Sequence, residues 1–174
     1  MRTLIFFLLA SPLWLAAGDP PRLRVAALDF EVVPDKGGIT ASKVGAVVRE
    51  VAGPLRTTVT LFEDGGRRVC LITPHMNSPK GANISPLIRR TAAEALKMPV
   101  ENVLLMLSHN HTDFNLVSNH LEASTTYRLA PGELPEPQLV PAGKDFLQKL
   151  TNTAAQLPSR LQPVTVWWAV GSEG

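Results

Sequence analysis

The sequence has one cysteine, Cys70, so no internal disulfide can form and stability must come from packing. Cys70 lies in the apolar run Val69–Ile72, which predicts a small buried hydrophobic residue. Basic and acidic residues number 17 and 15, and no block of like charge is present. This excludes the clustered basic face by which proteins bind nucleic acids. No internal repeat is visible, and 174 residues suffice for one domain with a sizeable core.

The sequence also lacks an apolar run of the ~20 residues that a transmembrane helix needs. The N-terminal run Leu4–Leu15 is shorter, follows Arg2 and precedes the small residues Ala16, Ala17 and Gly18, which is the pattern of a secretory signal peptide. We therefore expect residues 1–18 to be cleaved and residues 19–174 to be exported to the periplasm or secreted. An uncleaved membrane anchor is the alternative.

The first half of the mature chain predicts three strands, of which two form a hairpin. The clearest signal is the segment from Glu63 to Gly66, because its two glycines favour a tight turn between flanking strands. β-branched and apolar residues predominate in the three predicted strands, which are Leu23–Phe30, Arg56–Glu63 and Arg67–Thr73.

A helix and a further strand follow the hairpin. Ser85 can cap a helix whose first residue is Pro86 and whose apolar residues recur at helical spacing through Lys97. The next strand includes the apolar run Leu104–Leu107, whose composition predicts that it is buried. Strand, helix and strand predict a βαβ-like unit, and the fold class is therefore α/β with a mixed sheet flanked by helices.

The last third predicts one long loop, one helix and one strand. Prolines are frequent in the loop Ala130–Pro141, and apolar residues recur at helical spacing in Asp145–Leu157. A final strand is expected at Val164–Val170. At least one residue of the pair Trp167-Trp168 should pack in a core, because large aromatic residues are mostly buried.

The most informative segment is Ser108-His109-Asn110-His111-Thr112, which follows the apolar run directly. In α/β sheets, binding and catalytic groups gather beyond the carboxyl ends of the strands. Neutral imidazole is the commonest metal ligand. If the backbone turns after the strand, His109 and His111 can converge on one ion, and the pattern therefore predicts a metal or catalytic site.

These residues, in their order, resemble the neutral/alkaline, non-lysosomal ceramidases. Ser108–Thr112 occupies the place of the family's Thr-His-Thr-His-Ser signature. Gly53–Gly66 is similar to the family's early hairpin. Ala92–Leu104 is similar to the helix and lead-in strand before the signature, and Pro163–Gly174 to a later strand with its glycine turn.

The resemblance implies a zinc-dependent amidase that cleaves N-acyl sphingosine-like lipids to a fatty acid and a sphingoid base. It assigns a zinc ligand to His109 and a catalytic group beside the reacting amide to His111. The substrate partner is then a ceramide-like lipid amide, and contact with a membrane surface is left open. The family's other zinc ligands lie further along its chain. The resemblance therefore implies an incomplete N-terminal portion of a larger catalytic domain, and we expect little or no activity from these residues alone.

Two other interpretations of the sequence remain open. His109, His111 and Asp113 also resemble the start of the metallo-β-lactamase signature, in which Asp113 would be a metal ligand, although Phe114 stands where that signature has a histidine. Alternatively, the chain is a non-catalytic remnant or binding module, with apolar walls from Thr126–Arg128 and Trp167-Trp168. Of the remaining histidines, His75 would approach His109 if their strands are neighbours, and no role is expected for His120.

Overall fold

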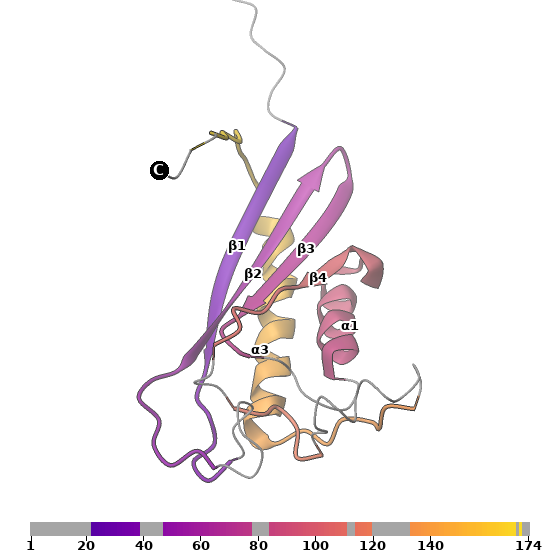
Figure 1. Cartoon of the computed structure of the whole chain (residues 1–174). Coiled ribbons are helices and arrows are strands. Elements are labelled where there is room, and N and C mark those ends of the chain that lie inside the picture. Colours follow the sequence, from indigo (N-terminus) through magenta and orange to yellow (C-terminus); the bar gives the residue numbers. More distant parts are fainter. Residues whose placement is uncertain are drawn as a thin grey trace, which may run out of the picture.

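The computed structural model of the chain describes residues 22–38, 47–77, 84–110, 114–119, 133–169 and 171. Figure 1 shows a twisted sheet with helices packed against one of its faces. In chain order the elements are β1 (Leu23–Val32), β2 (Leu55–Asp64), β3 (Arg67–Pro74), α1 (Ile84–Leu96), η1 (Val100–Asn102), β4 (Val103–Leu105), α3 (Pro141–Gln156), η2 (Leu157–Arg160) and β5 (Gln162–Pro163).

The sheet is mixed, with strand order β4-β3-β2-β1-β5. Neighbouring strands are antiparallel except for β3 and β4, which are parallel and are joined through α1. This confirms the predicted α/β class and the βαβ-like unit. The predicted signal peptide, residues 1–18, lies outside the described residues. Within the described part of the chain, no helix is both long enough and apolar enough to cross a bilayer.

The hairpin of β2 and β3 forms as predicted. Gly65 and Gly66 have φ values of 55° and 84°, so both adopt the left-handed conformation that a two-residue turn between paired strands requires. Asp64 pairs with Arg67 directly beside this turn. Because the turn fixes the register, the side chains of Val59 and Leu61 in β2 are fully buried on the face that meets the helices.

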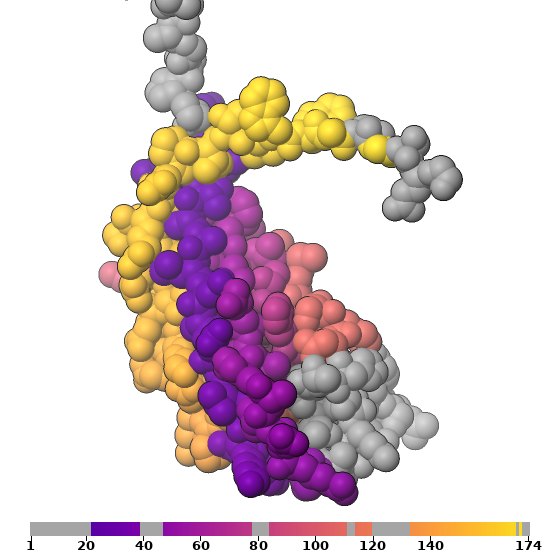
Figure 2. Space-filling view, turned by 90° about the vertical axis from the view of Figure 1, so that its left-hand side faces the viewer, coloured from indigo at the N-terminus to yellow at the C-terminus, as the bar shows by residue number. Residues whose placement is uncertain are grey.

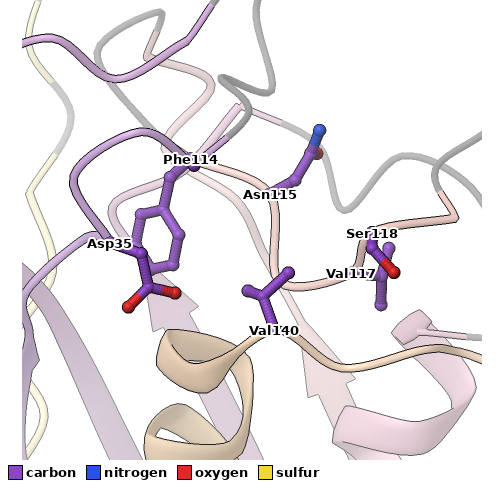
Figure 3. Close-up of a pocket in the computed structure, with 7 residues that line it drawn as sticks. Asp35, Phe114, Asn115, Val117, Ser118 and Val140 are labelled. Carbon is purple, nitrogen blue, oxygen red and sulfur yellow. The ribbon is translucent and has the colours of Figure 1, made fainter.

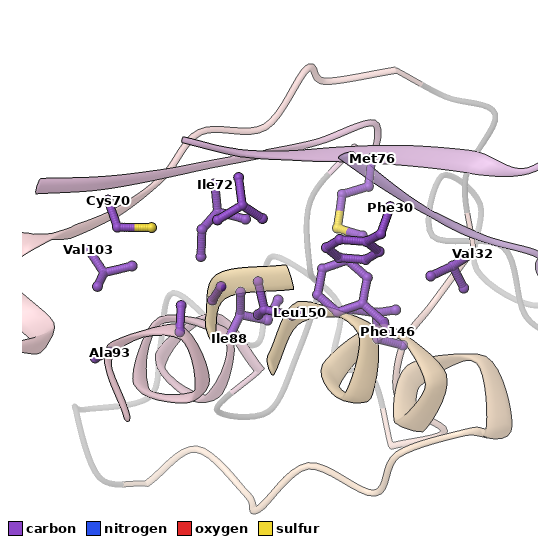
Figure 4. Close-up of a cluster of buried hydrophobic side chains, with 14 of the residues drawn as sticks. Phe30, Val32, Cys70, Ile72, Met76, Ile88, Ala93, Val103, Phe146 and Leu150 are labelled. Carbon is purple, nitrogen blue, oxygen red and sulfur yellow. The ribbon is translucent and has the colours of Figure 1, made fainter. Parts of the chain in front are cut away.

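The core lies between the sheet and the two helices (Figure 4). Cys70 is fully buried in it, as predicted, and burial raises the pKa of its thiol to about 12. Phe30 of β1 and Phe146 of α3 meet edge to face, with ring centroids 5.3 Å apart. This geometry suits two quadrupolar rings and fastens α3 to the sheet.

Both helices begin earlier than predicted. α1 begins at Ile84, so Ser85 does not cap it and Pro86 lies inside its first turn. Proline is tolerated there because the first N–H groups of a helix have no partner within the helix. α3 begins at Pro141 rather than near Asp145, with Val140 preceding its first residue. Proline suits that position because its fixed φ is already helical.

α1 ends with a residue in the left-handed conformation, at a position where glycine is the usual residue. Lys97 has φ 53°, its N–H donates to the Glu94 carbonyl at 3.2 Å, and the Met98 N–H donates to the Ala93 carbonyl at 3.0 Å. This pair of bonds is the Schellman motif, which satisfies carbonyls left over at the helix end. The chain then passes through η1 into β4, beside β3.

The run Leu104–Leu107 is not a buried strand. β4 occupies an edge of the sheet, and although Val103 is fully buried, Leu104 and Met106 are 49% and 58% exposed. The prediction was wrong because a continuous apolar run is equally compatible with a central strand and an edge strand. In the described part of the chain the helices cover only one face, so alternate residues of β4 point away from the core.

The predicted strand Val164–Val170 is also wrong for its described residues, 164–169. Here β5 consists of Gln162 and Pro163, and the Val164 N–H still donates to the Leu23 carbonyl at 3.0 Å, but no strand continues beyond it. Trp167 and Trp168 are 89% and 83% exposed, so neither packs in a core. Figure 2 shows this segment standing out from the body of the molecule. β5 lies at an edge of the sheet and ends with Pro163, and proline has no N–H with which to extend the ladder.

Candidate active site at the carboxyl ends of β3 and β4

The carboxyl ends of β3 and β4 meet at one edge of the molecule because these two strands are parallel. Backbone hydrogen bonds continue beyond the regular strands. The Met106 N–H donates to the Ile72 carbonyl at 2.9 Å, and the His109 N–H donates to the Met76 carbonyl at 3.1 Å. The His109 backbone is therefore held against the segment that follows β3, which is the place predicted for the site.

His109 has φ 53°, and within the described residues only Lys97 shares a positive φ among residues other than glycine. The left-handed conformation turns the chain immediately after the strand, which is the condition for the motif histidines to converge. Its cost for a residue with a Cβ is roughly 1–2 kcal/mol. Such costs persist at functional sites, where the surrounding structure holds the residue in place.

Of the other predicted site residues, some lie among the described residues and others lie outside them. His75 follows β3 directly, its side chain is exposed, and its N–H donates to the Arg56 carbonyl at 2.9 Å. β3 and β4 are neighbours, as the prediction for His75 and His109 required, and the side chain of His109 is exposed as well. His111, Asp113, His120 and Thr126–Arg128 lie outside the described residues, so the roles predicted for them stay predictions.

A zinc site would need about three protein ligands. Within the described ranges, no three histidine, cysteine, aspartate or glutamate side chains gather closely enough to hold a metal ion. His109 offers a suitable donor, since imidazole is a common zinc ligand. The donor type therefore fits zinc, but the described residues supply too few donors for a complete site.

A cavity of about 230 Å³ lies beside the segment that follows the motif (Figure 3). Its walls come from the loop after β1, from the segment 114–119 and from the residue before α3. They are Asp35, Gly38, Phe114, Asn115, Val117, Ser118 and Val140. This cavity was not predicted from the sequence, because its walls come from segments far apart along the chain. Apolar residues at 114, 116 and 117, directly after a polar motif, are the signal that was available.

The walls of this cavity are held by backbone pairing. The segment after the motif runs antiparallel to the segment before α3, with a bridge between Val117 and Leu139. The Ser118 N–H donates to the Gln138 carbonyl at 2.8 Å, and the Val140 N–H donates to the Leu116 carbonyl at 3.1 Å. The start of α3 and the continuation of the motif are therefore one packed unit.

A second hollow, of about 590 Å³, lies near the hairpin turn, at the opposite end of β3 from the motif. It includes Glu63, whose carboxylate is paired with the guanidinium groups of Arg24 and Arg68. Hydrogen bonds from Arg24 and then Arg68 hold the pKa of Glu63 below its usual value. This charge cluster belongs to the sheet and lies away from the predicted site.

Comparison with solved structures identifies the fold. A ceramidase structure described as complexed with C2 superposes with a TM-score of 0.57 at 16% sequence identity, covering 83% of this chain and 22% of the other. The neutral ceramidase of Pseudomonas aeruginosa gives a TM-score of 0.54 at 15% identity, with the same coverage. The fold is shared with neutral ceramidases.

The extent of this ceramidase-like fold is limited. The chain spans about a fifth of the length of these two ceramidases. No protein-family model matches the sequence, and no curated protein matches it. At such identities the likeness concerns the fold alone. The likeness confirms the expected α/β architecture. It does not test the activity, the zinc ion or the roles of His109 and His111.

Proposed function

We propose that this chain contributes the His109-bearing part of a zinc-dependent amide hydrolase of the neutral ceramidase type, acting on N-acyl sphingosine-like lipids. The observation that carries the proposal is the left-handed backbone of His109 at the carboxyl end of a parallel strand, in a ceramidase-like fold. Its products would be a fatty acid and a sphingoid base.

In this proposal His109 is a zinc ligand and His111 is the group beside the reacting amide. A bound zinc ion lowers the pKa of a water ligand to about 7 and polarises a carbonyl oxygen. The hydrogen bond from the His109 N–H to the Met76 carbonyl supports this proposal, because it fixes the backbone of the proposed ligand. The remaining ligands would come from outside the described residues.

Zinc binding provides the first test. Zinc is titrated into the wild-type protein, into His109→Ala and into His120→Ala, the last being a matched control at a histidine to which no role is assigned. We expect weak binding by the wild type and the control, and at least a tenfold loss of affinity in His109→Ala. Zinc binding that survives this substitution would place the metal elsewhere.

Hydrolysis of a fluorescent N-acyl sphingosine provides the second test. The assay uses the polypeptide as the source cell produces it, and compares wild type with His109→Ala, His111→Ala and Asp113→Asn. We expect the two histidine variants to lose hydrolysis and Asp113→Asn to keep most of it. Loss of both activity and a metal ion in Asp113→Asn would instead favour the metallo-β-lactamase type, because a neutral amide is a poor substitute for a ligating carboxylate.

Export remains part of the proposal. The apolar stretch Leu4–Leu15 and the small residues that follow it support a cleaved signal peptide. N-terminal sequencing of the protein recovered outside the cytoplasm should begin at Asp19. Recovery of the intact Met1 terminus from the cytoplasm would contradict it.

A further inference from the structure

The hollow near the hairpin turn is lined by more positive than negative charge. It lies between the turn that joins β2 to β3 and the segment that follows α1, and its volume is about 590 Å³. Its walls are Glu63, Gly66, Arg67, Arg68, Val69, Lys97, Met98, Pro99 and Asn102. Three cationic side chains and one carboxylate give this lining a net charge of +2. The hollow therefore favours an anionic ligand over a neutral or cationic one.

The one carboxylate of the lining, that of Glu63, is already neutralised. Its Oε2 accepts a hydrogen bond from Arg68 Nε at 2.7 Å, and its Oε1 is paired with Arg24, whose guanidinium adds a further positive charge. Asp64, beside the turn, is paired with Arg22. The acidic side chains of the hairpin therefore do little to offset the cations that remain.

The side chains of Arg67, Lys97 and Asn102 carry donors that the fold does not use. Within the described residues these three side chains make no hydrogen bond and no ion pair. An arginine offers five N–H donors, a lysine three and an asparagine amide two. Guanidinium and ammonium groups are the usual protein partners of phosphate oxygens. The unused donors therefore match an anion that carries several oxygen atoms.

Lys97 stands where a helix end usually has glycine. Its φ of 53° is unfavourable for a residue with a Cβ, and such conformations are retained mainly at functional sites. The carboxyl end of a helix is negatively polarised, which by itself opposes an anion. However, the Ala93 and Glu94 carbonyls accept the N–H groups of Met98 and Lys97. The ammonium group of Lys97 is then the free charge at this wall of the hollow.

We propose that this hollow binds a phosphate monoester group. At neutral pH such a group carries a charge of about −1.5 to −2 and three acceptor oxygens, which suits the unpaired cations Arg67 and Lys97. Val69, Met98 and Pro99 form an apolar wall in the same hollow. An ester with a compact organic group should therefore bind better than inorganic phosphate. The hollow lies at the opposite end of β3 from the histidine motif, so the inference does not rest on the proposed hydrolysis.

Calorimetric titration with phenyl phosphate and with inorganic phosphate, in metal-free buffer, provides the test. Arg67→Gln and Lys97→Gln each remove one charge, and each should weaken binding of phenyl phosphate roughly fivefold, the loss expected for one exposed ion pair. Lys144→Gln removes the same charge at an exposed position of α3 outside the hollow and should leave the affinity unchanged. His109→Ala should also bind as the wild type does, so failure of the zinc proposal leaves this result intact.

Vesicles distinguish a soluble ester from one carried by a lipid. Phosphatidylcholine vesicles with and without phosphatidic acid are sedimented with the wild type, Arg67→Gln and Lys144→Gln. Binding that needs phosphatidic acid and is weakened only in Arg67→Gln would identify a lipid-borne ester, whereas binding of phenyl phosphate alone would identify a soluble one. Absence of saturable binding to either form would overturn the proposal. An equal loss in Lys144→Gln and Arg67→Gln would also overturn it, because the effect would then reflect overall charge.

Discussion

Gly143 lies directly against the backbone of Leu116. A Cβ atom at Gly143 would overlap the Leu116 carbonyl oxygen and lie 3.0 Å from its carbonyl carbon. The same carbonyl accepts the Val140 N–H at 3.1 Å. The first turn of α3 therefore rests on the loop that continues from the histidine motif, and only a residue without a side chain permits this approach.

Replacing Gly143 by alanine should destabilise the protein by about 1–3 kcal/mol, the usual cost of overpacking. The direction is informative, because glycine to alanine at an unhindered helical position normally stabilises by about 0.4–1 kcal/mol. Urea unfolding measures the difference. Gly53→Ala is the matched control, since a Cβ there meets nothing within 4 Å. Equal stability of Gly143→Ala and wild type would mean that the loop moves aside freely.

Cys70 should be unreactive toward thiol reagents in the folded protein. Its side chain is fully buried and the pKa of its thiol is raised to about 12, so almost no thiolate is present at mildly alkaline pH. Labelling by a disulfide reagent should be complete only in concentrated guanidinium. A control with Cys70→Ala and Val69→Cys moves the thiol to the neighbouring residue, which is 40% exposed, and should react at once. Rapid labelling of native Cys70 would show that the sheet opens readily.

Glu63 should make the folded protein sensitive to acid. It lies between Arg24 and Arg68 in the register of the sheet, and Arg68 Nε donates to it at 2.7 Å. Because the folded state lowers the pKa of Glu63, its contribution to stability is present above the unfolded pKa and is lost as the pH falls through the folded value.

Glu63→Gln should therefore be less stable than wild type at neutral pH, and this difference should shrink as the pH falls below about 4, near the unfolded pKa of a glutamate. Urea midpoints measured across the acid range give the comparison. Glu94→Gln, at an exposed position of α1, serves as the control and should follow the wild-type curve. A difference between Glu63→Gln and wild type that stays constant with pH would contradict the assigned ion pairs.

Local signals in the sequence predicted most of the fold. The two glycines at 65 and 66 fixed the hairpin, and helical spacing located α1 and α3 to within a few residues. The errors arose where tertiary position decides the outcome. Leu104 is apolar yet half exposed because β4 lies at an edge, and Trp167 is exposed because its segment leaves the sheet. Neither fact is encoded in the spacing of nearby residues.

The candidate site could be predicted only in part. An apolar strand followed by a polar motif correctly placed His109 beyond the carboxyl end of a strand. The prediction required the backbone to turn at this point. His109 does adopt a left-handed conformation there, and its N–H donates to the carbonyl of Met76, which follows a different strand. The cavity was not predicted, because Asp35, Val117 and Val140 come together only through the antiparallel pairing of distant loops.

The backbone and the side chain of His109 should be separable by substitution. Both His109→Ala and His109→Gly remove the imidazole, but only glycine adopts φ 53° without a Cβ penalty. His109→Gly should therefore be more stable than His109→Ala by about 1 kcal/mol, while both variants lose zinc affinity equally. Urea unfolding and zinc titration of the same preparations give the two quantities.

Lys97 provides the matched control for this last prediction, because it also has φ 53° but caps α1 at the opposite end of β4 from the motif. Lys97→Gly should raise stability relative to Lys97→Ala by a similar amount, since glycine is the preferred residue at this position of a Schellman motif. Zinc affinity should be the same in both Lys97 variants and in wild type. If the two His109 variants were equally stable, the histidine would not be strained. If either retained wild-type zinc affinity, His109 would not be a ligand.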